Sequence, residues 1–310
     1  MKNKVCFINP YFGLFPKHFN YWLECCRRNP DYTWIIITDS NENYDYPTNV
    51  RIIKTYLSEL KKRIEKLVGF TVCLDKPYKL CDVRPLFGDL FSKEIEEYTH
   101  WGYCDFDLIF GNLNHFFSDD ILERYDKVSA MGHMTVLKKT ESIVNLYKTC
   151  NYRKVLQDNR NRTFDELMFS PNINELIVDH NLKLKKTVEY SDIGATNYNF
   201  HLFKYISGKK TTKEDYKPTI FWYTNGILYK AYLNNEKVLM EEIAYVHFSR
   251  RAIEAPKEIY NRFAIIPNEI ISCNEVTSTL IKENSKNRTA YCLKRVYKRV
   301  EKAVRLRIGV

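Results

Sequence analysis

The chain has 310 residues, of which 45% are hydrophobic and 15% aromatic. This content is enough to bury a substantial core, in one large domain or in one domain with an appendage. The net charge of +10 is concentrated near the C-terminus, where residues 282–310 contain ten Lys or Arg and two Glu. The basic character therefore belongs to a tail and not to the folded body.

The cysteines favour reduced, buried thiols in a cytosolic protein. Their number is odd and no C-x-x-C pair occurs, so a zinc site and a disulfide framework are both poorly supported. The N-terminal residues predict a strand and not a signal peptide, and no stretch has the roughly 20 apolar residues of a membrane span. The nine positions are 6, 25, 26, 73, 81, 104, 150, 273 and 292.

The first part of the chain predicts alternating strands and helices. Residues 4–12 and 32–40 are short β-branched and aromatic runs, which predict buried strands. Residues 16–30 and 55–69 have apolar residues at helical spacing, and the second of these helices ends at Gly69. Strand, helix and strand at this spacing indicate a βαβ unit in a parallel sheet.

The later elements are less regular. Residues 79–95 predict a helical segment, and residues 98–113 and 126–139 predict two further strands. Residues 151–217 alternate helix and loop without a clean pattern, and residues 219–251 predict a hairpin or meander. We therefore expect an α/β fold with a mostly parallel, Rossmann-like central sheet flanked by helices.

Two aspartates, Asp105 and Asp107, stand one residue apart in "YTHWGYCDFDLIFGNL". On an extended strand they would project from the same face, with Phe106 on the other. Two hard oxygen ligands at the end of a strand can hold a divalent cation and, through it, a diphosphate. The pair alone is a weak signal, because a chain with this many Asp contains about 0.8 such pairs by chance.

Three surrounding segments strengthen the interpretation. "YKLCDVRP" contains Lys79, Asp82 and Arg84, and the two cations suit phosphate oxygens. "AYVHFSRR" places His247 after a predicted strand with Arg250 and Arg251 beside it, so an imidazole can complete a metal shell and guanidiniums can meet a diphosphate. "INPYFG" follows the first predicted strand, where parallel sheets bind nucleotides.

With these segments in order, residues 5–140 resemble a family of bacterial, metal-dependent GT-A glycosyltransferases of capsule and cell-wall polysaccharide synthesis. The matching pieces are "INPYFGLFPKHFNYWLECCRRNPDYTWIIITDS", "YKLCDVRPLFGDLF", "WGYCDFDLIFGNL" and "MGHMTVLKK". The resemblance implies a GT-A domain at residues 1–281, with a nucleotide-sugar half at about 1–140 and an acceptor half at about 141–281. It also implies transfer of a hexosyl group from a nucleoside diphosphate sugar, by analogy a UDP-sugar, to a hydroxyl group.

The resemblance also assigns roles to residues. Mn²⁺ or Mg²⁺ would be held by Asp105 and Asp107 of the family's D-x-D motif and by His247. His133 would contact donor or acceptor. The donor would be contacted by Asn9, Pro10, Tyr11, Phe12, Gly13, Asp39, Lys79, Asp82, Arg84, Asp105, Arg250 and Arg251.

Each role has a structural alternative. For Lys79 and Arg84 the alternative is a surface charge, and for Asp82 it is a cap of the helix that follows. His133 and His247 are equally consistent with satisfied structural histidines, and Asp39 with a turn at the end of its strand.

The sequence offers one acidic pair for a catalytic base, Asp165 and Glu166 in "NRTFDELMF". An inverting transferase needs a carboxylate near the acceptor hydroxyl, whereas a retaining enzyme does not. The alternative is that both are solvated residues at the start of a helix.

Residues 282–310 predict a basic amphipathic helix. Leu293, Val296, Tyr297, Val300 and Val304 recur at helical spacing, and the intervening positions are mostly Lys and Arg. Such a helix is typical of the surface of an anionic membrane, which predicts a cytoplasmic protein on the inner face of the cell membrane and a lipid-linked or glycan acceptor. The alternative is a helix docked on the body with a solvated basic face.

Two other classes of function remain open. A non-catalytic protein could bind membrane or nucleic acid through its basic tail, although we expect no nucleic-acid partner. A metal-dependent nucleotidyltransferase would also use paired aspartates, but the sequence has no glycine-rich phosphate loop.

Overall fold

The computed structural model describes residues 2–166, 169–194, 197–206, 209–213, 217–249, 251–286 and 288–308. Their contacts divide the chain into two compact units. Unit 1 comprises Met1–Phe106, Asn112–Val188 and Ser207–Lys209, and unit 2 comprises Asp107–Gly111, Glu189–Ile206 and Lys210–Val310. The chain passes from unit 1 to unit 2 between Phe106 and Asp107, inside the acidic motif. The donor and acceptor halves expected on either side of residue 140 remain a prediction.

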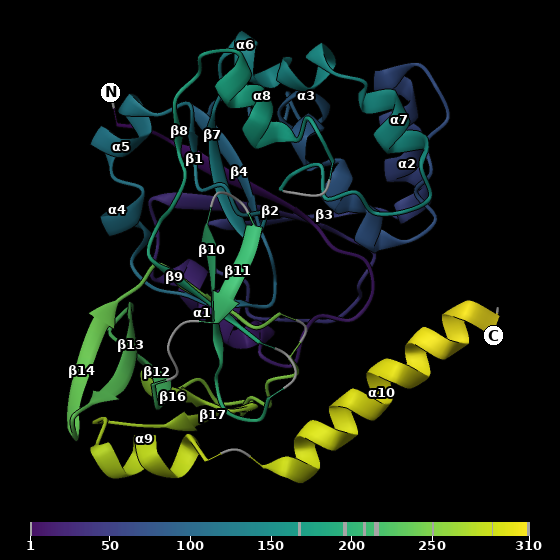
Figure 1. The fold of residues 1–310 in the computed structure, drawn as a ribbon. Coiled ribbons are helices and arrows are strands. Elements are labelled where there is room, and N and C mark those ends of the chain that lie inside the picture. Colours follow the sequence, from purple (N-terminus) through teal and green to yellow (C-terminus); the bar gives the residue numbers. More distant parts are fainter. Residues whose placement is uncertain are drawn as a thin grey trace. The chain divides into compact units, whose positions relative to one another are not determined.

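Unit 1 is built on a seven-stranded, mostly parallel sheet (Figure 1) with the order β3-β2-β1-β4-β7-β6-β8. The first four strands in this order are parallel, whereas β7 is antiparallel to both β4 and β6. The expected α/β class with a mostly parallel central sheet is confirmed. The strands are β1 (Val5–Pro10), β2 (Tyr32–Thr38), β3 (Val50–Lys54), β4 (His100–Cys104), β6 (Lys127–Val128), β7 (Met134–Lys138) and β8 (Leu184–Lys185).

The helices of unit 1 are short apart from α1 (Phe19–Arg27) and α2 (Leu57–Val68), which the apolar periodicity predicted. Gly69 ends α2 in the left-handed region, at φ 75°, as a C-cap glycine does. Apolar side chains of α2, the 79–95 segment and α8 form one core with the sheet. The remaining elements are η1 (Pro77–Asp82), η2 (Arg84–Leu86), α3 (Phe87–Leu90), α4 (Leu113–Phe116), α5 (Asp119–Arg124), α6 (Glu141–Val144), η3 (Leu146–Thr149), α7 (Tyr152–Gln157) and α8 (Ile173–Asp179).

The strand expected over residues 98–113 is wrong as a single element. It is β4, a break at residues 105–107 with a bend at Phe106 and Asp107, and then β5 (Leu108–Phe110), which belongs to a different sheet. Because a bend separates the two strands, the strict alternation of side chains expected for Asp105 and Asp107 does not apply. Asp105 does lie at the carboxyl end of β4, where parallel sheets place their ligands.

The second sheet has the order β11-β10-β9-β15-β5. Its strands β9 (Tyr190–Ile193), β10 (Leu202–Ile206) and β11 (Lys209–Lys213) lie in a stretch without a clean sequence pattern. In unit 2, β15 (Tyr245–His247) lies between β9, to which it is parallel, and β5, to which it is antiparallel. His247 is therefore the last residue of a central strand.

The third sheet, also in unit 2, is an antiparallel sheet with the order β14-β13-β12-β16-β17 and with its own apolar core. The hairpin or meander expected over residues 219–251 is confirmed for β12, β13 and β14, whereas the end of that segment forms β15 of the second sheet. The elements are β12 (Thr219–Thr224), β13 (Ile227–Asn234), β14 (Lys237–Glu242), β16 (Arg262–Ile266), β17 (Glu269–Ser272), α9 (Ser278–Asn284) and α10 (Thr289–Ile308), the yellow terminal helix of Figure 1.

The start of the basic tail, expected at residue 282, falls within α9. Ile281 of this helix is fully buried in the core of the third sheet, so α9 belongs to the folded body. The amphipathic segment proper is α10. No helix in the described part of the chain is both long enough and apolar enough to span a membrane.

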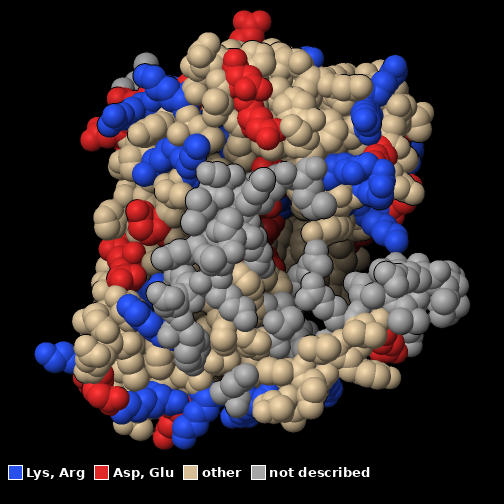
Figure 2. All heavy atoms as spheres, viewed as in Figure 1, with Lys and Arg blue, Asp and Glu red and all other residues tan. Residues whose placement is uncertain are grey.

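Charges of both signs occur on the face of the molecule drawn in Figure 2. Blue Lys and Arg side chains and red Asp and Glu side chains are both present there among the described residues. This pattern agrees with the near-neutral charge of the chain before residue 282.

Candidate functional site

The acidic motif is anchored by the residue between its two aspartates. Phe106 is buried in an aromatic cluster, with ring centroids 4.8 Å from both Tyr11 and Trp22. The backbone N–H of Asp105 donates to the carbonyl of His133 at 2.7 Å, and its own carbonyl accepts from the Trp22 indole at 3.2 Å. The bend after β4 is therefore fixed by packing and by two hydrogen bonds.

Arg84 joins two of the predicted site carboxylates within unit 1. Its guanidinium forms an ion pair with Asp105 and donates to Asp165 Oδ2 at 2.9 Å. It also donates to the carbonyl of Gly132 at 2.9 Å and lies over the Tyr103 ring at 5.1 Å. Arg84 is thus an organised, largely buried cation, and the alternative of a solvated surface charge is wrong for this residue.

Asp165 is buried, with 2% of its surface exposed, so the alternative of a solvated helix-start residue is wrong for it. Burial raises its pKa to about 6, although Arg84 acts in the opposite direction. Its Oδ1 atom is buried without a hydrogen-bond partner among the described residues. A Cβ atom on Gly132 would lie 2.7 Å from Asp165 Oδ2, so only glycine fits beside this carboxylate.

Glu166 is the more accessible member of this acidic pair. Its side chain is 18% exposed, and Oε1 lies 4.0 Å from Nε2 of His133. Its carbonyl accepts from the Asn174 side chain, which also binds the carbonyl of Ala130. The structure therefore brings together Arg84, Asp105, His133, Asp165 and Glu166, which lie far apart in the sequence.

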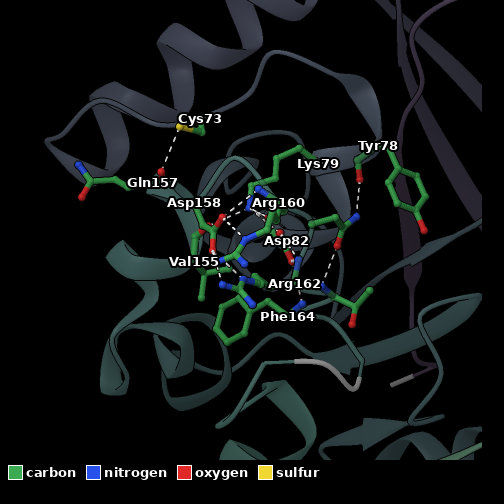
Figure 3. Close-up of polar contacts among 12 residues, drawn as sticks. Cys73, Tyr78, Lys79, Asp82, Val155, Gln157, Asp158, Arg160, Arg162 and Phe164 are labelled. Atoms are coloured by element: carbon green, nitrogen blue, oxygen red, sulfur yellow. Dashed lines mark hydrogen bonds and ion pairs between the residues drawn. The ribbon is translucent and has the colours of Figure 1, made fainter. Parts of the chain in front are cut away.

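Lys79 and Asp82 form a buried ion pair at 2.6 Å (Figure 3). The Lys79 ammonium also donates to the carbonyls of Val155 and Arg160, both at 2.8 Å. These three bonds use its full donor capacity, and 5% of the residue is exposed. The expected contact of Lys79 with donor phosphates is therefore replaced by internal bonds, because burial of an ammonium requires them.

The carboxylate of Asp82 holds the loop that leads to Asp165 (Figure 3). It accepts from the backbone N–H of Arg162 at 2.8 Å and from that of Phe164 at 2.9 Å. The residue is fully buried. Asp82 therefore acts across the chain on residues 158–164 instead of lining an open donor site or capping its own helix.

The N-terminal loop is bound to Asp39. Asp39 Oδ1 accepts from the backbone N–H of Gly13 at 2.9 Å, and Gly13 has a φ of 103° that favours glycine. The Asn9 side chain is buried and donates to the Cys104 carbonyl, which links the ends of β1 and β4. Pro10, Tyr11 and Phe12 continue from the end of β1. Their contacts with a nucleotide remain a prediction.

Unit 2 contains a second constellation, formed by Asp107, Asp192, His247 and Ser249. Nε2 of His247 lies 3.5 Å from Asp107 Oδ1, and Nδ1 lies 2.7 Å from Asp192 Oδ1. The Ser249 hydroxyl donates to the same Asp192 oxygen at 2.7 Å. Burial alone would lower the pKa of His247, but the carboxylates of Asp107 and Asp192 raise it well above its ordinary value.

The strands of the second sheet explain this geometry. His247 pairs with Asp192 on one side and with Leu108 on the other, so Asp107 directly precedes the β5 residue opposite His247. The backbone N–H of Phe248 donates to the carbonyl of Asp107 at 2.9 Å. An imidazole nitrogen and a carboxylate oxygen are atoms that coordinate Mn²⁺ and Mg²⁺ in proteins, so Asp107 and His247 suit a divalent cation.

Sequence reasoning missed Asp192 and Ser249. The available signal was a carboxylate inside the short strand "YSDI", where burial of a charge demands a partner. The partner lies 55 residues away, and its identity could not be obtained from the local pattern.

The predicted diphosphate contacts involve the two arginines after His247, Arg250 and Arg251. Arg250 lies outside the described residues. Arg251 is 2% exposed and donates to the backbone carbonyls of Tyr198, Gly194 and Asn197. The expected diphosphate contact is wrong for Arg251, because its guanidinium is used to hold these loop carbonyls inside unit 2.

The raised pKa of Asp165 predicts a pH-dependent gain in stability for Asp165→Asn. The pKa is 3.8 in the unfolded chain and about 6 in the folded protein. The stability contribution of this group is therefore fully present below pH 3.8 and is lost as the pH rises through 6. The amide does not ionise, so the variant should gain up to about 3 kcal/mol on the wild type between pH 4 and pH 7. Urea unfolding at several pH values measures this.

The matched control for this experiment is Glu166→Gln, which removes the neighbouring, more exposed carboxylate. Urea unfolding of this variant over the same pH range shows how much of the pH dependence comes from the neighbouring carboxylate. A stability difference for Asp165→Asn that is constant with pH would contradict the pKa assignment.

The buried pair predicts that Asp82→Asn destabilises unit 1 and loosens the following loop. The variant leaves the Lys79 ammonium buried without its counter-ion, which costs about 3–5 kcal/mol. The amides of Arg162 and Phe164 should also exchange with solvent faster. Urea unfolding and amide hydrogen exchange measure the two effects.

Asp75→Asn is the control, because Asp75 pairs with Lys61 at 3.6 Å with 78% of its side chain exposed, and a solvated ion pair contributes little to stability. Equal losses of stability in the two variants would refute the role given to Asp82.

No curated protein matches the sequence. Among solved structures, the galactosyltransferase LgtC in complex with donor and acceptor sugar analogues is similar with a TM-score of 0.32 at 9% identity, over 61% of this chain and 75% of that chain. Mouse xyloside xylosyltransferase 1, in its apo form, is similar with a TM-score of 0.30 at 9% identity, over 60% of this chain and 78% of that chain. These likenesses are too distant to carry an argument about this site.

One family model matches most of the sequence, over residues 7–274, and its description is a family of unknown function (DUF6625). The matched region includes both the Arg84 network and the His247 constellation. The chain belongs to the DUF6625 family.

Proposed function

We propose that this protein is a metal-dependent glycosyltransferase. It transfers a hexosyl group from a nucleoside diphosphate sugar, a UDP-sugar by analogy, to a hydroxyl group of a lipid-linked or polysaccharide acceptor in the synthesis of cell-surface glycans such as capsule. The observation that carries the proposal is the pairing at 3.5 Å of His247 with Asp107, the second aspartate of the acidic motif that follows β4.

The proposed metal ligands are Asp105, Asp107 and His247. The coordinating atoms of Asp107 and His247, Oδ1 and Nε2, already face one another in unit 2. Asp105 precedes Asp107 by two residues, and the packing of Phe106 fixes the backbone between them. When bound, Mn²⁺ or Mg²⁺ supplies positive charge that stabilises the departing diphosphate.

The proposed nucleotide-binding region consists of Asn9–Gly13 and Asp39. These residues lie at or directly after the carboxyl ends of β1 and β2, which are adjacent parallel strands, and open α/β sheets bind nucleotides at such ends. The bond from Gly13 to Asp39 holds the loop in place before a ligand arrives, which lowers the entropic cost of binding.

Arg84 and the acidic pair have distinct proposed roles. Asp165 is buried against Arg84, so it acts through that arginine as a positioning residue. Arg84 in turn holds one oxygen of Asp105. Glu166 is the carboxylate accessible enough to act as a base toward an acceptor, with His133 beside it.

The proposal predicts metal-dependent binding of a nucleotide sugar. A panel of nucleotide sugars, tested by thermal shift and by donor hydrolysis with and without Mn²⁺, should contain at least one donor with a metal-dependent response. Asp107→Asn should lose that response while keeping the circular dichroism spectrum of the wild type.

Asp158→Asn, which removes a carboxylate outside the motif, is the control and should respond like wild type. If no nucleotide sugar gives a metal-dependent response, the proposed activity is refuted. If Asp107→Asn responds like wild type, the ligand assignment is refuted.

We propose that α10 attaches the protein to the inner face of the cell membrane. The apolar side chains Leu293, Val296, Tyr297 and Val300 share one face of the helix and are 50–70% exposed, so the alternative of an apolar face docked on the body is not supported for these residues. Lys294 is also exposed. The side chains of Arg295, Lys298, Arg299, Lys302, Val304 and Arg305 lie outside the described residues. All of these except Val304 carry a positive charge, which attracts anionic lipid.

Truncation after Tyr291 tests this attachment. The cut leaves α9 whole and keeps the hydrogen bond from Tyr291 to Asn268 at 3.0 Å. The truncated protein should sediment less with phosphatidylglycerol vesicles, because both the apolar face and the basic residues are lost. Phosphatidylcholine vesicles, which have no net charge, should retain little of either protein. Equal sedimentation of the two proteins with anionic vesicles would refute the role of α10.

A further inference from the structure

Asp192 is the most deeply buried member of the His247 constellation. It lies in β9 with 1% of its surface exposed, directly across from His247 in the parallel pairing with β15. A buried carboxylate is costly unless hydrogen bonds satisfy it. Here one oxygen, Oδ1, accepts from both the His247 ring and the Ser249 hydroxyl, each at 2.7 Å.

The hydrogen bond fixes which nitrogen of His247 faces away from Asp192. Because Nδ1 lies against a carboxylate that can only accept, this nitrogen carries the proton. Nε2, which lies 3.5 Å from Asp107, is then the nitrogen that binds a cation, in exchange for the proton that it otherwise holds toward that carboxylate. A carboxylate behind a ligating histidine fixes its ring orientation and raises its basicity.

Ser249 holds the same oxygen of Asp192 from the other side. Its backbone has a φ of 46°, an uncommon conformation for a residue other than glycine. The conformation places the hydroxyl on Asp192 and within 3.5 Å of Nδ1 of His247. The backbone conformation two residues after His247 thus brings a second hydrogen-bond donor, the Ser249 hydroxyl, to the carboxylate of Asp192.

We infer that Asp192, supported by Ser249, is a positioning residue that orients His247 so that Nε2 is presented to a divalent cation. The inference rests on the proposed function for the identity of His247 as a ligand. It adds two residues that lie outside the acidic motif and that act on the cation only through the imidazole.

The test is a double-mutant cycle on the full chain, with Mn²⁺ alone as the probe. The affinity for Mn²⁺ is measured by the electron paramagnetic resonance signal of the free ion for wild type, Asp192→Asn, His247→Asn and the double variant. Asp192→Asn should weaken binding about 10–100-fold, the usual effect of removing a partner of a metal ligand. In the His247→Asn background the same change should have no further effect, because its route of action has already been removed.

Ser249→Ala should weaken binding less than Asp192→Asn, since it removes only the support of the carboxylate. Glu269→Gln is the control, because it neutralises an exposed carboxylate of unit 2 and should leave the affinity unchanged. Thermal unfolding of each variant shows whether the fold is retained. If Asp192→Asn does not fold, Ser249→Ala and its combination with His247→Asn form the same cycle.

The outcomes separate the two proposals. If wild type does not bind Mn²⁺, the metal-dependent function and this inference both fail. If wild type binds Mn²⁺ and Asp192→Asn binds equally well, the inference alone is overturned. An equal loss in the wild-type and His247→Asn backgrounds also overturns it, because Asp192 would then act on the fold and not through the imidazole.

Discussion

The arrangement of carboxylates in unit 1 depends on one cation, the guanidinium of Arg84. Asp105 and Asp165 lie 60 residues apart in the sequence, and their carboxylates are held close together because Arg84 binds both. Without this cation, the burial of Asp165 would leave an uncompensated charge at a site where even a methyl group on Gly132 has no room. Arginine suits this role because its planar fork can donate to several acceptors at once and stays charged when buried.

The second ion pair, between Lys79 and Asp82, has a different function. Among the described residues, it does not contact Asp105 or Asp165 directly. It fixes the loop that precedes Asp165, since the carboxylate of Asp82 accepts from the backbone N–H groups of Arg162 and Phe164. Asp82 and Arg84 belong to the same sequence motif but have different roles. Arg84 contacts the site carboxylates, whereas Asp82 fixes the backbone that leads to one of them.

The sequence predicted the first strands and helices because their apolar spacing is regular and their ends carry clear signals, such as Gly69. It failed at residues 98–113, where the bend at Asp105–Asp107 is caused by the packing of Phe106 against aromatic residues from other parts of the chain. The sequence identified Lys79, Asp82 and Arg251 as candidate site residues, but it did not predict that they are buried. The backbone groups that bind them lie in distant segments. Asp192 was missed for the same reason: its partner becomes visible only when β9 and β15 pair.

Phe106 has a consequence for how the motif can vary. Its ring fills a cluster that includes Trp22 and Tyr11, while its carbonyl lies 3.1 Å from the His18 ring. A polar side chain buried at this position would lose its hydrogen bonds to water, and a small side chain would leave a cavity. The middle letter of the motif is therefore under a packing constraint of its own, and substitutions tolerated there over evolution should be confined to large apolar side chains.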